Sequence, residues 1–260
     1  MKTFLKCTTS LAILGLFGVH AAAQEASETE LRQDTVTVTV QKREENLRDV
    51  PVAVSVVDAT ALDDLGLDEF SELARFVPGF EVQNQSPNNP GFVMRGITSD
   101  DGASTTEPRV SVFQDGVSIS KARGSFVELF DLERIEVAKG PQSTLYGRGA
   151  LIGAVNIVQN RARPGMIDSA AELRAGNYGL VSTDLMINLP LGDMIGVRFA
   201  TRLKRQDGYV ENLLGGPDYN SVNTEAYRLG IAFEPNDAFR FDVIANYQTD
   251  DTTGTSFKSI

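Results

Sequence analysis

An alternation of apolar and polar side chains with a period of two restricts the fold more than any other feature of this chain. It runs through four segments, which are STDLMINLP (182–190), IGVRFATRLKR (195–205), EAYRLGIAFEP (225–235) and FRFDVIANYQ (239–248). A period of two places successive side chains on opposite faces of a β-strand. In each segment one face is apolar and the other is charged, polar or small. The pattern therefore predicts antiparallel strands after residue 165.

Two classes of protein use strands of this kind. Strands of about ten residues with one apolar face are typical of outer-membrane β-barrels, which have lipid outside and water inside. A soluble antiparallel sheet with one buried face gives the same alternation. The connections favour the barrel, because those at 191–193 and 235–238 are short like periplasmic turns and the one at about 206–223 is long like an extracellular loop. The connection at 177–179 is short as well, so this asymmetry rests on one loop.

The number of strands raises a separate problem. With residues 171–176 as the first strand, the segment 166–260 supplies about five strands. Five strands leave unpaired edges, which a bilayer does not tolerate, and single-chain bacterial barrels have about eight strands or more. We therefore expect that the sequence is a truncated piece of a longer protein, or that the strands do not form a membrane barrel.

The N-terminus has the organisation of an export signal. Lys2 and Lys6 make a basic start, an apolar core follows at 11–19, and small residues at 21–23 offer a cleavage site before Gln24. We expect a signal peptide at 1–23, the alternative being a buried N-terminal helix. The rest of the chain has no run of about 20 apolar residues, so no transmembrane helix is expected.

Removal of this signal would also remove Cys7 and His20, the only cysteine and the only histidine. A chain without them has no thiol or imidazole chemistry and no site built from the usual metal-binding side chains. We therefore expect no catalytic residue, no metal site and no cofactor. Loss of Lys2 and Lys6 lowers the net charge from −11 by two, to −13. An acidic chain of this kind is not expected to bind nucleic acid.

Residues 24–46 make a polar leader that contains a short alternating run, DTVTVTV. The run consists of Asp34, Thr35, Val36, Thr37, Val38, Thr39 and Val40. Its valines share one face of a strand and its threonines share the other. Such a strand either joins a sheet of its own chain or stays available for strand addition by another chain. Alternation alone favours the internal strand.

Residues 47–164 mix the two kinds of secondary structure and predict a small α+β domain. Asp58 is placed to cap a helix at 59–65 that Gly66 ends, and a second short helix at 68–76 stops before Pro78. Asp115 and Gly116 predict a hairpin turn. The remaining elements expected are strands at 50–58, 80–83, 91–97, 133–138 and 153–160, polar loops at 84–90 and 98–108, and a helical turn at 127–132.

A glycine-rich stretch, KGPQSTLYGRGALIGAVNIV (139–158), invites comparison with phosphate-binding loops. A P-loop requires a second glycine where Leu145 stands, and a dinucleotide fingerprint is one residue shorter than the stretch from Gly147 to Gly153. A β-rich sequence follows instead of a helix. We therefore interpret the glycines as turn and close-packing residues between two strands.

Several segments together resemble TonB-dependent outer-membrane receptors. DLERIEVAKGPQSTLYGRGALIGAVNIV (131–158) is similar to the closing segment of their plug domain, and VPVAVSVVDATAL (50–62) is similar to its opening. FVMRGI (92–97) and VSVFQDGV (110–117) resemble internal strands of the plug, and DTVTVTV resembles the TonB box. The plug motif residues are Arg95, Gly96, Asp115, Gly116, Lys139, Gly140, Pro141, Tyr146, Gly147, Gly153 and Asn156.

The resemblance implies an α+β plug domain at 47–164 followed by an incomplete antiparallel transmembrane β-barrel at 165–260. It implies a receptor in the outer membrane of a Gram-negative bacterium, in contact with outer-membrane lipid. The expected partners are the energy-coupling protein TonB, which would pair with residues 34–40, and a small ligand such as a metal chelate, for example an iron–siderophore complex. The alternatives are an exported soluble binding or adhesion module and a nonfunctional receptor fragment.

The sequence departs from the family pattern in two places. Lys139 stands where the family commonly has arginine. If Lys139 and Arg95 clamp carboxylates of the barrel, the lysine cannot form the bidentate pair of hydrogen bonds that an arginine forms. The short leader leaves no room for an N-terminal signalling domain, so no signalling role is expected. The polar loops at 84–90 and 98–108 are candidates for ligand contact because of their polarity and length, and the alternative is that they are only solvated loops. The candidate residues are Asn84, Gln85, Asn88, Asn89, Asp100 and Asp101.

Overall fold

The structure is a computed structural model that describes residues 36–86, 89–98, 108–119 and 127–254. The predicted signal peptide, the leader up to residue 33, and Asp34 and Thr35 lie outside these ranges. So do three of the predicted ligand residues, Asn88, Asp100 and Asp101.

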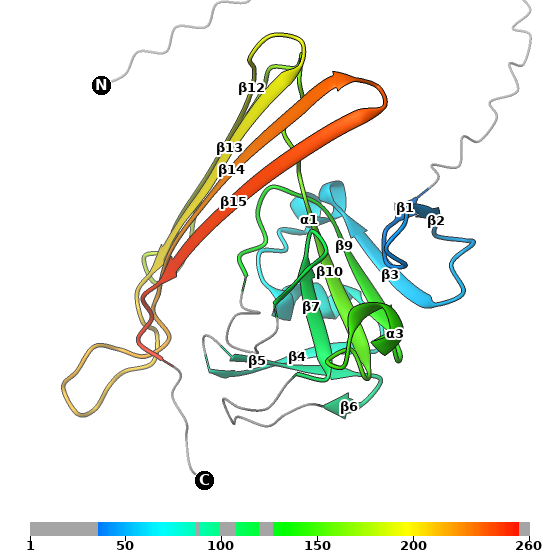
Figure 1. The fold of residues 1–260 in the computed structure, drawn as a ribbon. Helices are drawn as coiled ribbons and strands as arrows, with labels where there is room; N and C mark the ends of the chain where they lie inside the picture. The colour runs from blue at the N-terminus through cyan, green and yellow to red at the C-terminus, as the bar shows by residue number, and fades with distance from the viewer. Residues whose placement is uncertain (1–35, 87–88, 99–107, 120–126, 255–260) are drawn as a thin grey trace, which may run out of the picture. The chain divides into compact units, whose positions relative to one another are not determined.

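A five-stranded mixed sheet forms the centre of the α+β part (Figure 1). Its strand order is β3–β9–β10–β7–β8, in which β10 and β7 are parallel and the other neighbours are antiparallel. The strands are β3 (Ala53–Asp58), β7 (Val110–Gln114), β8 (Val117–Ile119), β9 (Leu132–Lys139) and β10 (Gly153–Gln159). These strands confirm the elements predicted at 50–58, 133–138 and 153–160, and the hairpin with its turn at 115–116.

Two short helices follow β3 and pack on this sheet. In α1 (Ala59–Leu65), the Asp58 side chain caps the first turn by accepting a hydrogen bond from Ala61 N at 2.8 Å, as predicted. The second predicted helix is divided into α2 (Phe70–Leu73) and a 3₁₀ turn, η1 (Ala74–Phe76). Phe70 lies edge-on to Phe92 with ring centroids 5.6 Å apart, which ties α2 to the core.

The predicted polar loop at 84–90 is shorter than expected. β4 (Phe80–Ser86) and β5 (Asn89–Met94) extend into it, and β6 (Ile97–Thr98) completes a three-stranded sheet. Asn84 pairs with Pro90 and Ser86 with Asn89, with a register shift between them. Pairing of the backbones overrides the polar composition here, because a hairpin satisfies the amide and carbonyl groups that a loop leaves to water.

The glycine-rich stretch connects β9 to β10 through a one-turn helix that was not predicted, α3 (Ser143–Tyr146). Gly140 has φ +115°, and a Cβ there would lie 3.4 Å from Arg95 Nη1. A Cβ on Gly153 would lie 2.8 Å from the Ala138 carbonyl oxygen. These glycines allow close packing inside the domain, in agreement with their interpretation as turn and packing residues.

The helical turn predicted at 127–132 is wrong. Residues 127–131 are irregular, and Asp131 has φ +48° before β9 begins at Leu132. Phe130 instead packs against Ala200 and Ala226, which lie on strands far along the chain. Tertiary contacts therefore decide the conformation of this segment, and a local pattern does not record them.

A second sheet contains five antiparallel strands in sequence order, as predicted. The strands are β11 (Asp168–Ala175), β12 (Val181–Pro190), β13 (Ile195–Gln206), β14 (Val222–Asn236) and β15 (Phe239–Asp250). Figure 1 shows β12 to β15 running alongside one another, in yellow to red. Each strand pairs with the next in continuous register, apart from one irregularity near the turn between β14 and β15.

The exposure of this sheet is inverted relative to a soluble protein. Its apolar face is open, and the exposed side chains include Leu185, Ile187, Phe199, Leu229, Ile231, Phe241 and Val243. Its buried face carries Asn188, Arg198, Arg202 and Arg228 beside small residues. A soluble sheet would bury the apolar face, so this arrangement contradicts the soluble alternative. Among the described residues, no helix is long and apolar enough to cross a membrane.

Candidate functional site

The DTVTVTV segment is folded against the first domain. β1 (Thr37–Val38) pairs antiparallel with β2 (Glu45–Asn46), and Leu47 N donates a hydrogen bond to Val36 O at 2.9 Å. The strand is therefore shorter than the seven residues predicted. Within the described chain the β1–β2 sheet has two strands, so the second edge of β1 carries no strand. Strand addition uses an edge without a strand, but Val38 is fully buried, so of the two residues of β1 only Thr37 is exposed.

Two of the three valines in the segment are buried. Val38 and Val40 have exposed fractions of 0% and 1%, whereas Val36 is 42% exposed. The prediction that the valines lie on one face therefore agrees with the burial of two of the three. They pack in a cluster with Phe113 and Tyr146 and with alanines of β9, β10 and the connection between those strands. Burial of a valine side chain contributes about 1.5–3 kcal/mol, so these contacts hold the segment in place.

Thr39, between the buried valines, contacts a buried polar group that we call the Thr39 cluster (Thr39, Arg134, Glu136 and Asn156). Thr39 N donates to Glu136 Oε1 at 2.8 Å, and Asn156 Nδ2 donates to Thr39 Oγ1 at 3.2 Å and to Glu136 Oε2 at 3.1 Å. Arg134 Nε donates to Glu136 Oε1 at 2.8 Å. The cluster forms because Glu136 and Asn156 are register partners on β9 and β10.

Lys42 closes the hairpin turn and was not found from the sequence. Its N–H donates to Thr39 O at 2.8 Å, and its ammonium lies 4.4 Å from the ring centroids of both Phe113 and Tyr146. Burial lowers the pKa of this ammonium. Burial and the nearby Glu136 carboxylate raise the pKa of the Tyr146 phenol. Lys42 also has φ +62°, a backbone conformation that no local pattern in QKREEN signals.

Three other plug motif residues, Arg95, Lys139 and Gly140, lie close together. Arg95 has φ +53°, its N–H donates to Gly79 O at 2.7 Å, and its guanidinium lies over Gly140. Lys139 Nζ donates to Ser55 Oγ at 2.9 Å and to Pro78 O at 3.2 Å. Within the described ranges neither cation pairs with a carboxylate of the second sheet. Gly96, Pro141 and Gly147 lie in the adjoining turns, and Asp115 and Gly116 form the β7–β8 turn.

The contacts between the plug and the strands have the opposite charge arrangement from the one expected for Lys139 and Arg95. At residues 128–131 the plug supplies carboxylates and the strands supply guanidiniums, whereas at the end of the plug Arg161 pairs with Asp242 of β15. Arg198 Nε donates to Asp131 Oδ2 at 2.9 Å, and Arg202 lies 3.4 Å from Glu128. Burial raises the pKa of the Glu128 carboxyl, whereas Lys204 and Arg202 oppose the shift. The charged face of the strands was predicted, but its partners lie in the segment predicted wrongly as a helical turn.

Arg228 completes this contact through the backbone. Its Nη1 donates to Phe130 O at 3.0 Å and to Asp131 O at 2.7 Å, and its guanidinium carbon lies 4.5 Å from the centroid of the Phe130 ring. Every residue has a backbone carbonyl, so the sequence does not predict which carbonyls or which aromatic ring an arginine will contact. These contacts fix residues 128–131 to β13 and β14.

The candidate ligand hairpin adjoins the long-loop ends of the strands. Asn84 and Gln85 lie on β4, and Asn89 lies on β5. Val82 and Pro90 of this hairpin border the same small cavity as Glu69. Glu69 Oε1 accepts a hydrogen bond from Lys204 Nζ at 2.8 Å, close to the point where β13 enters the long loop.

Comparison with known proteins identifies the first domain. Residues 46–154 match the family model described as the TonB-dependent Receptor Plug Domain. The chain carries a TonB-dependent receptor plug domain. Over 239 residues this chain is 25% identical to the iron-regulated outer membrane virulence protein of Vibrio cholerae, covering 86% of itself and 36% of that protein. It is 31% identical over 154 residues to the pesticin receptor of Yersinia pestis, covering 58% of itself and 22% of that protein.

Solved structures agree with the fold of the chain. The ferric yersiniabactin uptake receptor of Yersinia pestis superposes with a TM-score of 0.67 at 25% identity, over 76% of this chain and 31% of that one. The ferripyoverdine receptor of Pseudomonas aeruginosa superposes with a TM-score of 0.70 at 21% identity, over 83% and 27%. The chain thus spans about a third or less of these relatives, which confirms a plug followed by an incomplete barrel. Its location is the outer membrane of a Gram-negative bacterium, as predicted.

Proposed function

We propose that the chain takes part in energised uptake of a scarce ligand across the outer membrane. In this proposal the ligand binds at the long-loop ends of the strands. TonB pairs with residues 34–40 at the other end and remodels the plug so that the ligand passes.

The observation that carries this proposal is the placement of two hairpins at opposite ends of the strands. The β4–β5 hairpin adjoins the ion pair of Glu69 with Lys204, at the long-loop end. The β1–β2 hairpin borders one cavity with Arg163 and Arg240. Arg163 N donates to Asn188 Oδ1 at 2.9 Å, and Arg240 Nη2 donates to Ala162 O at 3.0 Å. Asn188 and Arg240 lie next to the short turns, so this hairpin is at the short-turn end of the strands.

The hairpin that holds the TonB-binding segment favours a partner that adds a strand. Among the described residues β1 has no strand on its second edge, but Val38 and Val40 are buried and Thr39 is bound to Glu136. A partner strand gains main-chain hydrogen bonds at that edge, and alternate side chains would provide specificity. Full pairing along residues 34–40 then requires the segment to leave the Thr39 cluster, so binding is coupled to a change in the plug.

The relatives favour an iron–siderophore complex as the ligand. Their names refer to iron regulation, to ferripyoverdine and to ferric yersiniabactin. Another relative is a vitamin B12 transporter of Vibrio vulnificus, 28% identical over 131 residues, and this gives cobalamin as the second candidate.

Calorimetry with the TonB C-terminal domain tests the coupling. A peptide of residues 34–40 should bind this domain, and a scrambled peptide of the same composition should not. The purified chain should bind more weakly than the peptide, because its valines are buried, and Glu136→Gln should recover part of the difference. Equal binding of the native and scrambled peptides would refute the proposal.

A further inference from the structure

The segment at residues 36–40 repeats its own sequence. It reads Val36, Thr37, Val38, Thr39 and Val40, so the tripeptide Val-Thr-Val occurs twice in it and the two copies share Val38. The plug holds the second copy, because Val38 and Val40 are buried whereas Val36 and Thr37 are exposed. The chain therefore has an occupied site and, next to it, another copy of the sequence that occupies the site.

The contacts at this site recognise a threonine through its hydroxyl and its backbone. Thr39 N and Thr39 Oγ1 donate hydrogen bonds to Glu136 Oε1 at 2.8 and 3.1 Å. The same hydroxyl accepts hydrogen bonds from Arg134 Nη2 at 3.3 Å and from Asn156 Nδ2 at 3.2 Å. Valine has the shape of threonine without the hydroxyl, so a valine here would leave buried polar groups with fewer partners, which is costly.

The neighbouring contacts select valines without distinguishing one valine from another. Val38 and Val40 pack beside the Thr39 cluster against two aromatic rings and the alanines of β9, β10 and the connection between those strands. A shift of a strand by two residues keeps every side chain on its own face. Such a shift brings Thr37 to the position of Thr39. Val36 and Val38 then take the places of the two buried valines.

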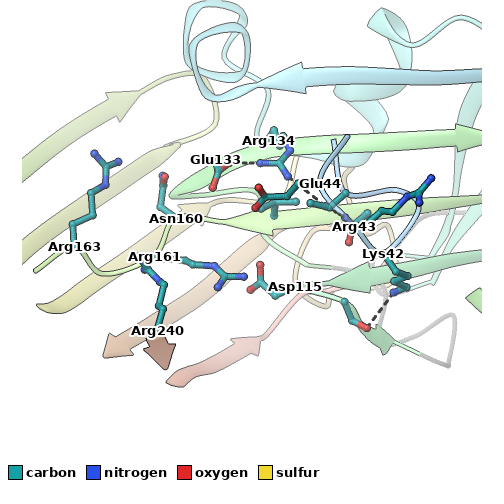
Figure 2. Close-up of a pocket in the computed structure, with 14 residues that line it drawn as sticks. Lys42, Arg43, Glu44, Asp115, Glu133, Arg134, Asn160, Arg161, Arg163 and Arg240 are labelled. Carbon is teal, nitrogen blue, oxygen red and sulfur yellow. Dashed lines mark hydrogen bonds and ion pairs between the residues drawn. The ribbon is translucent and has the colours of Figure 1, made fainter. Parts of the chain in front are cut away.

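The hairpin has room for the two residues that this shift adds to its connection. The connection between β1 and β2 spans residues 39–44, and the entropy cost of closing a loop rises only slowly with its length. A cavity of about 680 Å³ borders Thr39 and the turn residues 42–44 (Figure 2). The longer connection can therefore extend into this cavity while β2 keeps its place.

The turn decides which copy is the principal occupant. Lys42 N donates to Thr39 O at 2.8 Å, and its ammonium lies 4.4 Å from the ring centroids of Phe113 and Tyr146. These contacts hold the turn directly after the second copy and favour it over the first. A shift in the opposite direction would bring Lys42 into the apolar pocket of Val40, where its charge would be buried. The sequence therefore permits the shift in one direction.

We propose that the Thr39 cluster and the two valine pockets form a binding site for a Val-Thr-Val tripeptide, which residues 36–38 occupy in exchange with residues 38–40. The exchange draws the segment toward the plug by about 7 Å, the length of two residues in a strand. The buried charges of the cluster keep a threonine partner in both states. A consequence for TonB, which would meet a shorter free segment, rests on the proposed function, whereas the exchange itself does not.

Amide hydrogen exchange of the purified chain in detergent, without TonB, tests this proposal. The Leu47 amide donates to Val36 O at 2.9 Å, so it reports opening of the hairpin. Thr37→Val alone should change its rate by no more than about twofold, because Thr37 is exposed. Thr39→Val should accelerate it by less than about tenfold, because Thr37 then fills the site, whereas uncompensated loss of a hydrogen bond to a charged group gives about ten- to hundredfold. Adding Thr37→Val to Thr39→Val should accelerate it at least about fivefold more.

Two controls separate the shift from a general loosening of the hairpin. Thr39→Ser keeps the hydroxyl in the cluster, so Thr37→Val should add no more than about twofold in that background. Thr60→Val makes the same substitution at an exposed site on α1, and it should add no more than about twofold to Thr39→Val. The proposal is overturned if Thr37→Val acts equally in the threonine, serine and valine backgrounds, or if it has no effect in the valine background.

Discussion

The backbone N–H of Thr39 donates a hydrogen bond of 2.8 Å to the carboxylate of Glu136, which is fully buried on β9. This bond joins the segment predicted to receive TonB to the central sheet of the plug. Access to that segment therefore depends on a contact inside the chain.

Glu136→Gln should loosen the segment without changing its shape. The amide keeps an acceptor for Thr39 N but loses the charge, and a hydrogen bond to a charged group contributes about 1.5–3 kcal/mol. Hydrogen exchange of residues 36–40 should accelerate about ten- to hundredfold in the variant. Glu81→Gln, an exposed site on β4, is the control. Identical exchange in the two variants would show that Glu136 does not hold the segment.

The Lys42 ammonium should be coupled energetically to the Tyr146 ring. A cation over an aromatic face contributes about 0.5–2 kcal/mol, depending on how far it is desolvated. A double-mutant cycle with Lys42→Met and Tyr146→Leu should give a coupling of this size in the opening free energy of the β1–β2 hairpin, measured by hydrogen exchange. Strict additivity of the two changes would contradict the contact as described.

Asp115 should make stability decrease with rising pH. Burial raises its pKa above 3.8 in the folded state, whereas the Gln159 backbone N–H, Arg228 and Arg161 oppose the shift. The folded state then holds the proton more tightly, so this group's contribution falls as pH rises from 3.8 through the folded pKa. Asp115→Asn should remove that decrease, and Asn also tolerates the φ of +48°.

Urea unfolding in micelles at several pH values, for the wild type and Asp115→Asn, measures this effect. The stability of the wild type relative to the variant should fall as the pH rises through this window. A relative stability that rises over the same window would reverse the assigned sign.

Arg198→Ala should destabilise the contact between plug and strands strongly. It leaves Asp131, which is 7% exposed, as a buried carboxylate without its main partner. Removal of one member of a buried ion pair costs about 3–5 kcal/mol. The free energy of unfolding in urea should fall by that amount, against about 0.5 kcal/mol or less for the exposed control Arg205→Ala. A loss no greater than the control's would show that the pair is dispensable.

A charge on the open face of the second sheet should be penalised according to depth. Leu229 lies in the middle of β14, and Phe239 begins β15 at a short turn. In lipid vesicles, Leu229→Lys should cost about 2–4 kcal/mol and Phe239→Lys about 0–1 kcal/mol, because the penalty is greatest at the bilayer midplane. Equal costs at the two sites would contradict the orientation of this face toward lipid.

Patterns within a few neighbouring residues correctly predicted the strands of the second sheet and the start of the first helix. The alternation of Leu229, Ile231 and Phe233 gave the strand and its two faces, and Asp58 gave the start of α1. The irregular conformation of residues 127–131 and the cation–π contacts of Lys42 depend on residues about 70 to about 100 positions away, so no window of sequence contains them. Of the candidate site, Asn156 and Tyr146 were singled out through family resemblance, whereas Glu136 and Arg134 were missed.

The acidic segment before β9 also has a consequence for how the strands assemble. A shift of β13 by two residues keeps every apolar side chain facing lipid, so alternation does not distinguish the correct pairing from that error. Arg198 and Arg202 meet Asp131 and Glu128 in one alignment, and such a shift would displace both guanidiniums by about 7 Å. The plug precedes the strands in the chain, and its carboxylates thus select the correct register of the strands that follow.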